Sequence, residues 1–131
     1  MDLLKKIVLA ASLSVAMIAT APVSMAAGKI EKATVAEVVE AIKETIKLSE
    51  ESLAAIESGA DKKSILDLLK RTKQSSKRIE SNIVDRLRQT ANARVSKARS
   101  AVKKDDKETA VAFMTEAVQR FKDIQKKHSS F

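Results

Sequence analysis

The sequence predicts an all-α protein, an up-down four-helix bundle built from two helical hairpins. Residues 27–131 contain no proline and only the glycines Gly28 and Gly59, so little interrupts long helices. Apolar residues recur there with the 3.6-residue period of one helix face. A weak internal repeat relates residues 54–69 to residues 100–114, with one extra residue in the first copy. Two tandem helical hairpins account for all three observations.

The first 26 residues have the pattern of a cleaved secretory signal peptide. A basic start, MDLLKK, precedes an apolar run of 15 residues, IVLAASLSVAMIATA. That run is shorter than the roughly 20 residues needed to span a bilayer. Ser24 and Ala26 place small residues at the −3 and −1 positions of a cleavage site. We therefore expect cleavage after Ala26, export to the periplasm, and a single domain over residues 27–131.

The first helix is expected over residues 34–58. Thr34 and Glu37 form a capping-box pattern, in which each side chain bonds the other residue's backbone amide. One face carries, at helical spacing, Val35, Val38, Val39, Ile42, Ile46, Ser49, Leu53 and Ile56. Gly59 is placed to end the helix in the left-handed conformation.

Two helices, about 61–80 and 82–104, are expected in the middle of the chain, the first capped by Asp61. Their stripe positions are Ile65, Leu68, Leu69, Thr72, Ser76, Ile79, Ile83, Val84, Leu87, Ala91, Val95, Ala98 and Val102. The stripe is almost continuous, so the alternative is one helix about 66 Å long at 1.5 Å per residue. We favour a break near Ser81, because the flanking helices would each cover only half of such a helix.

The last helix is expected over about 106–128 and ends at the only histidine, His128. Its stripe positions are Ala110, Met114, Ala117, Phe121, Ile124 and His128. The imidazole is a candidate ligand for a cofactor held between helices. The alternative is a partly solvated group near the negative pole of the helix dipole. Haem is disfavoured, since Met114 lies about 20 Å away along the helix and no CxxCH is present.

Carboxylates on the first helix form the second candidate set. Glu37, Glu40 and Glu44 lie on its polar side at i, i+3 and i+7, a spacing that lets carboxylates share a divalent cation. Lys43 interrupts this patch, so the alternative is a solvated face with local ion pairs. The predicted metal site thus consists of His128, Glu37, Glu40 and Glu44, and the predicted ligand is a divalent metal ion.

Positive charge is concentrated in residues 61–104, which carry eight lysines and six arginines against four acids. The helix over 82–104 supplies the predicted anion-binding residues, Arg86, Arg88, Lys97, Arg99, Lys103 and Lys104. The preceding helix adds Lys70, Arg71, Lys73, Lys77 and Arg78. Guanidinium groups suit phosphate and carboxylate, so an anionic lipid, lipopolysaccharide or an acidic protein is the expected partner. The alternative is a basic face that serves solubility and pairs with the acidic first helix.

Two classes of function are disfavoured. Nucleic acid is not expected, because the signal peptide directs export and residues 27–112 contain no aromatic side chain for base stacking. The chain has no cysteine, no glycine-rich phosphate motif and no arrangement of serine, histidine and aspartate typical of hydrolases. We therefore expect a protein that is not an enzyme.

Residues 36–79 read AEVVEAIKETIKLSEESLAAIESGADKKSILDLLKRTKQSSKRI and are followed by a second, similar hairpin. This arrangement resembles the small metal-binding protein family of bacterial periplasms. The resemblance implies an exported four-helix protein that buffers divalent metals through histidines, of which this chain has His128. The last residues, DDKETAVAFMTEAVQRFKDIQKKHSSF, are similar to the final helix of the soluble b-type cytochrome bundle. There His128 would match a haem-ligating histidine. The function expected first is metal buffering; the alternative is an envelope interaction protein that docks through its basic middle hairpin.

Overall fold

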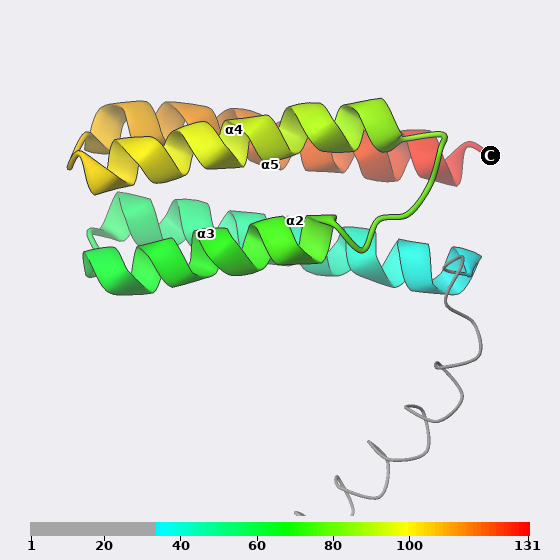
Figure 1. Cartoon of the computed structure of the whole chain (residues 1–131), viewed down its shortest axis with the longest axis horizontal. Coiled ribbons are helices and arrows are strands. Elements are labelled where there is room, and N and C mark those ends of the chain that lie inside the picture. The colour runs from blue at the N-terminus through cyan, green and yellow to red at the C-terminus, as the bar shows by residue number, and fades with distance from the viewer. Residues whose placement is uncertain (1–33) are drawn as a thin grey trace, which may run out of the picture. The chain divides into compact units, whose positions relative to one another are not determined.

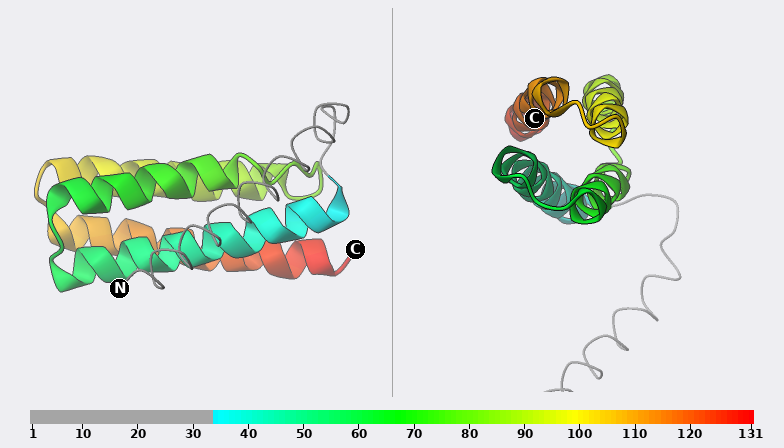
Figure 2. Two further views of the ribbon diagram at one scale, coloured as in Figure 1. Left: turned by 90° about the horizontal axis from the view of Figure 1, so that it is seen from below. Right: turned by 90° about the vertical axis from the view of Figure 1, so that its left-hand side faces the viewer.

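A computed structural model describes residues 34–131, which form four helices (Figure 1). These are α2 (Val35–Ser58), α3 (Lys62–Ser76), α4 (Asp85–Lys103) and α5 (Lys107–Ser129). Consecutive helices run in opposite directions, and α5 also packs against α2. Seen end on, the helices occupy the corners of a square, with α2 diagonal to α4 and α3 diagonal to α5 (Figure 2). The predicted up-down four-helix bundle of two hairpins is confirmed.

The two ends of the bundle differ. One end, the turn end, carries the short connections between α2 and α3 and between α4 and α5 (Figure 1). The other, the open end, carries the start of α2, the end of α5 and the longer connection between α3 and α4. The predicted signal peptide, residues 1–26, lies outside the described residues. Within residues 34–131, no helix has the length and apolar character required to cross a membrane.

The predicted caps of α2 are confirmed. The Glu37 amide donates to the Thr34 hydroxyl at 3.1 Å, and the Thr34 amide donates to the Glu37 carboxylate at 2.7 Å. At the other end Gly59 has a φ of 76°, and the Ala60 amide donates to the Ala55 carbonyl at 3.0 Å. This six-to-one bond closes the helix in the manner of a Schellman motif.

The turn between α4 and α5 repeats that design with a different residue. Asp105 has a φ of 59°, and the Asp106 amide donates to the Ala101 carbonyl at 2.9 Å. Asp106 is also the N-cap of α5, whereas Ala60 separates the left-handed residue from the cap in the first turn. The structure therefore supports the internal repeat, including its one-residue difference in length.

Aspartates cap both helices that follow these turns. The Ser64 hydroxyl and amide donate to Asp61 at 2.7 and 3.1 Å, and these two bonds lower the pKa of the Asp61 carboxyl. Hydrogen bonds from Thr109, first its side chain and then its amide, lower the pKa of Asp106 in the same way. Both caps are therefore strongest when these carboxyl groups are ionised.

The joint between α3 and α4 breaks the chain where a break was predicted, so the single 61–104 helix is ruled out. The predicted end of α3 at residue 80 was wrong, since the helix ends at Ser76 and α4 begins at Asp85. The irregular segment 77–84 turns both Ile79 and Val84 into the core, where they are 1% and 0% exposed. Ile83, expected on the buried stripe, is instead 44% exposed.

The two hairpins bury different kinds of small residue. Between α2 and α3 lies a hydroxyl seam of four buried residues, Thr45, Ser52, Thr72 and Ser75. In α4 and α5 the small buried positions are alanines, Ala91, Ala98, Ala101, Ala110 and Ala117. Larger apolar side chains, such as Leu69, Met114 and Phe121, fill the remaining core. Small residues at helix interfaces allow close approach of the backbones, so each hairpin is tightly paired by a different chemistry.

Candidate functional site

Within residues 34–131, one salt bridge joins each of the four neighbouring helix pairs. Glu44 of α2 pairs with Arg78, just beyond α3, at 2.6 Å, and Glu50 of α2 pairs with Lys122 of α5 at 3.0 Å. Arg94 of α4 pairs with Glu116 of α5 at 2.8 Å.

The α3–α4 pair has the fourth of these salt bridges. Among residues 34–131 its only salt bridge joins Lys62 to Asp105 at 2.9 Å, at the turn end. The acidic helix α2 is diagonal to α4, so its carboxylates do not neutralise the α4 cations. The eight lysines and six arginines of residues 61–104 outnumber the four acids there, so the α3–α4 face keeps an excess of positive charge.

A hollow of about 520 Å³ lies on this face, and we name it the basic groove. Its charged lining consists of Lys63, Lys70 and Arg71 from α3, Arg99 from α4, and one acid, Asp67. Arg99 is half-buried and forms no salt bridge within residues 34–131. Its Nε is buried without a hydrogen-bond partner in that part of the chain, a feature that it shares with Arg88 and Arg120. An anion with several oxygens, such as phosphate, would supply the acceptors that this guanidinium lacks.

The structure distributes the six predicted anion-binding residues over different parts of α4. Arg99 lines the basic groove, and Arg88 pairs with the neighbouring Asp85. Lys97 lies on the α5 side, where its ammonium group is 5.4 Å from the centre of the Phe113 ring.

The other three predicted residues, Arg86, Lys103 and Lys104, are exposed, two of them at the C-terminus of α4. The predicted set thus contributes one residue to the groove. The α3 side of the groove, above all Lys63, was missed, although Lys70 and Arg71 had been noted as basic. The sequence did contain a pattern that predicts the α3 side of the groove. Lys63, Lys70 and Arg71 are spaced at i, i+7 and i+8, which places them on one helix face.

The predicted metal ligands do not converge. Glu37 serves the N-cap of α2, and Glu44 pairs with Arg78. Glu40 is exposed, and His128 lies near the end of α5. No group of three or more acids and histidines in residues 34–131 is arranged to hold a metal ion. Metal buffering therefore stays a prediction from resemblance.

His128 lines a second hollow, of about 420 Å³, between α2 and α5 near the open end. We name it the terminal groove. Val39 and Ile42 give it an apolar floor, and its other charged side chains are Lys43, Lys122 and Lys126. Carboxylates are absent from this lining. The ammonium groups of Lys43 and Lys126, which form no salt bridge within residues 34–131, repel a metal cation, so the surroundings of His128 do not resemble a metal site.

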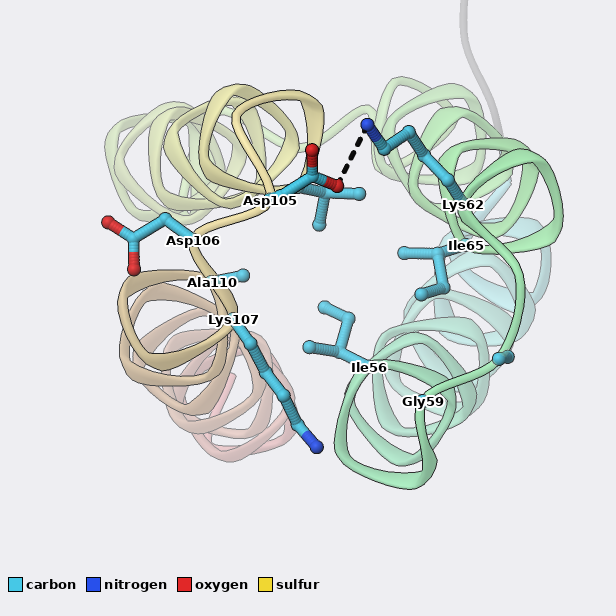
Figure 3. A pocket seen from close by; sticks show the side chains of 10 residues that line it. Ile56, Gly59, Lys62, Ile65, Asp105, Asp106, Lys107 and Ala110 are labelled. Atoms are coloured by element: carbon cyan, nitrogen blue, oxygen red, sulfur yellow. Dashed lines mark ion pairs between the residues drawn. The ribbon is translucent and has the colours of Figure 1, made fainter.

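A third hollow, of about 200 Å³, opens at the turn end. Ile56, Ile65 and Ala110 point toward its centre, whereas the Asp106 carboxylate points away from it (Figure 3). The Lys62–Asp105 ion pair crosses its rim (Figure 3). That pair balances its own charge, and Lys107 adds one further ammonium group to the lining.

No family model, characterised protein or solved structure matches the chain. The geometry of residues 34–131 therefore carries the functional argument.

Proposed function

We propose that this protein is a non-catalytic binding protein of the periplasm that docks its α3–α4 face on the phosphate groups of an anionic lipid surface. The main support for this proposal is the excess of positive charge in the basic groove. Lys63, Lys70, Arg71 and Arg99 line one hollow with a single acid, and Arg99 has no acidic partner in residues 34–131. Lipid phosphates and the phosphates of lipopolysaccharide share the chemistry that such a groove recognises.

The distribution of apolar side chains supports peripheral rather than inserted binding. The large hydrophobic residues exposed in the described part of the chain are Val35, Ile83 and Phe131, and none of them lies in the basic groove. Leu66 and Leu68 also line the groove but are half-buried, so we expect charge to contribute most of the attraction through this face. Each basic residue near an anionic membrane contributes about 1 kcal/mol at moderate salt, and the attraction is screened within a Debye length.

The test is sedimentation of the purified protein with vesicles of phosphatidylglycerol and phosphatidylcholine, and with vesicles of phosphatidylcholine alone. We expect binding to the anionic vesicles that weakens steeply as salt rises. The double variant Arg71→Gln/Arg99→Gln should bind about 30-fold more weakly, since two contributions of about 1 kcal/mol are lost. The matched control is Lys107→Gln/Lys127→Gln, which removes the same charge from α5 and should change affinity less than about threefold.

Two results would contradict the proposal. Equal losses in both double variants would show that net charge, and not the basic groove, controls binding. Failure to bind either anionic vesicles or lipopolysaccharide micelles, with retained binding to an acidic polypeptide such as polyglutamate, would replace the lipid surface by an acidic protein partner.

A further inference from the structure

The terminal groove continues along α2 as an apolar strip that reaches the open end of the bundle. Val35, Val39, Ile42 and Ile46 follow one another at steps of four, three and four, so they share one helix face. Val35 is 72% exposed, Val39 and Ile46 are half-buried, and Ile42 is buried beneath the groove. At 1.5 Å per residue the strip is about 16 Å long. A hydrocarbon chain lying on it would cover apolar surface that now contacts water.

The charges beside the strip have one sign. Lys43 of α2 and Lys122 and Lys126 of α5 line the groove together with His128. Lys122 is paired with Glu50 at 3.0 Å, whereas Lys43 and Lys126 form no salt bridge within residues 34–131. Two ammonium groups without acidic partners therefore flank the apolar floor. An anionic head group with an apolar tail complements both features.

We propose that the terminal groove binds one amphiphile, with its acyl chain along the part of the strip from Val35 to Ile42, about 10 Å long at 1.5 Å per residue, and its anionic head group between Lys43 and Lys126. The hollow of about 420 Å³ has the size of an ordinary small-molecule site, roughly 300–1,000 Å³. It lies on the α2–α5 side of the bundle, opposite the α3–α4 side that carries the basic groove (Figure 2). The amphiphile site therefore does not rest on the proposed surface docking.

The first experiment measures binding of a dansylated undecanoic acid to the purified protein by the rise in dansyl fluorescence. Dodecanoate, dodecyl phosphate and uncharged dodecanol then serve as competitors below the concentrations at which they aggregate. If dodecanoate alone displaces the probe, the ligand is a free fatty acid. If dodecyl phosphate alone displaces it, the site recognises a phospholipid-type head group. Displacement by both shows that the site recognises negative charge of either kind. Dodecanol should compete about tenfold more weakly. Equal competition by dodecanol, or no binding of the probe, would overturn the proposal.

The second experiment places the site. The double variant Lys43→Gln/Lys126→Gln should bind the probe about tenfold more weakly, since each exposed ion pair is worth up to about fivefold. Arg71→Gln/Arg99→Gln removes the same charge from the basic groove and should bind the probe within about twofold of the parent. Unchanged affinity in the lysine variant, with its helix content intact by circular dichroism, would overturn the assignment. If only the arginine variant loses vesicle binding, then vesicle docking through the basic groove and amphiphile binding in the terminal groove are independent functions.

Discussion

Thr45→Val tests how the hydroxyl seam between α2 and α3 stabilises the protein. The Thr45 hydroxyl donates to the Ala41 carbonyl at 2.7 Å and lies 2.8 Å from the Ser75 hydroxyl, which is therefore the donor across the interface. Ser75 is 5% exposed and has no other hydrogen-bond partner for its side chain within residues 34–131. Valine keeps the shape of threonine but removes the acceptor. We expect the free energy of unfolding to fall by about 1–2 kcal/mol, the cost of one unsatisfied buried hydroxyl.

Thr72→Val is the matched control in the same seam. The Thr72 hydroxyl donates to the Leu68 carbonyl at 2.8 Å and lies 3.2 Å from the Ser52 hydroxyl. Ser52 also has the Leu48 carbonyl within 2.8 Å, so it keeps a partner when Thr72 is replaced. The free energy of unfolding should therefore change by less than about 0.5 kcal/mol.

Urea unfolding followed by far-UV circular dichroism measures both effects, since the chain has no tryptophan or tyrosine to report by fluorescence. Thr45→Val/Ser75→Ala removes the donor as well as the acceptor and should recover about 1 kcal/mol relative to Thr45→Val alone. Equal destabilisation by Thr45→Val and Thr72→Val, or no recovery in the double variant, would refute this account of the seam.

Three further predictions concern the turns and the core. Gly59→Ala should lower the free energy of unfolding by about 1 kcal/mol in a urea titration, because φ is 76° although a methyl group would meet no atom within 4 Å. Asp105→Gly should raise the free energy of unfolding by about 0.5 kcal/mol, since φ is 59° at this position. A lower free energy of unfolding would show that the ion pair of Asp105 with Lys62 outweighs its backbone strain. The lowered pKa values of Asp61 and Asp106 mean that their stabilisation is complete above the unfolded carboxyl pKa, about 3.9, and is lost as the pH falls through the lower folded pKa. Thermal melts should therefore drop in that acidic range, and less so in Asp61→Asn/Asp106→Asn; an equal drop in that variant would contradict the assignment.

The sequence was sufficient for most of the fold because its local signals agreed. The capping box at Thr34, the left-handed Gly59 and the aspartate caps all lie where their residue types predicted them. The joint between α3 and α4 was less predictable, since it contains neither glycine nor proline. There the burial of Ile79 and Val84 decides the path of the chain, and burial depends on both hairpins together.

The candidate sites were harder to predict, because each draws on two helices. Arg99 was expected to bind an anion, but the helix periodicity of α4 does not reveal that Lys63 and Arg71 of α3 lie beside it. His128 was recognised as the end of an apolar stripe. Only the packing of α5 on α2 places Lys43, Lys122 and Lys126 around it, which a sequence pattern within α5 alone does not reveal.

Two hairpins of similar pattern in one chain create a problem of partner choice when many copies fold together. If the α2–α3 hairpin of one copy opened and α3 paired with α5 of another, the Ser75 hydroxyl would face alanines that offer no side-chain acceptor, whereas Thr72 would keep its bond to the Leu68 carbonyl. The hydroxyl seam thus distinguishes the correct partner from the near-identical wrong one, at the level of single hydrogen bonds. A bundle with alanine in both seams would be freer to exchange hairpins between molecules, and so to form swapped dimers at high concentration.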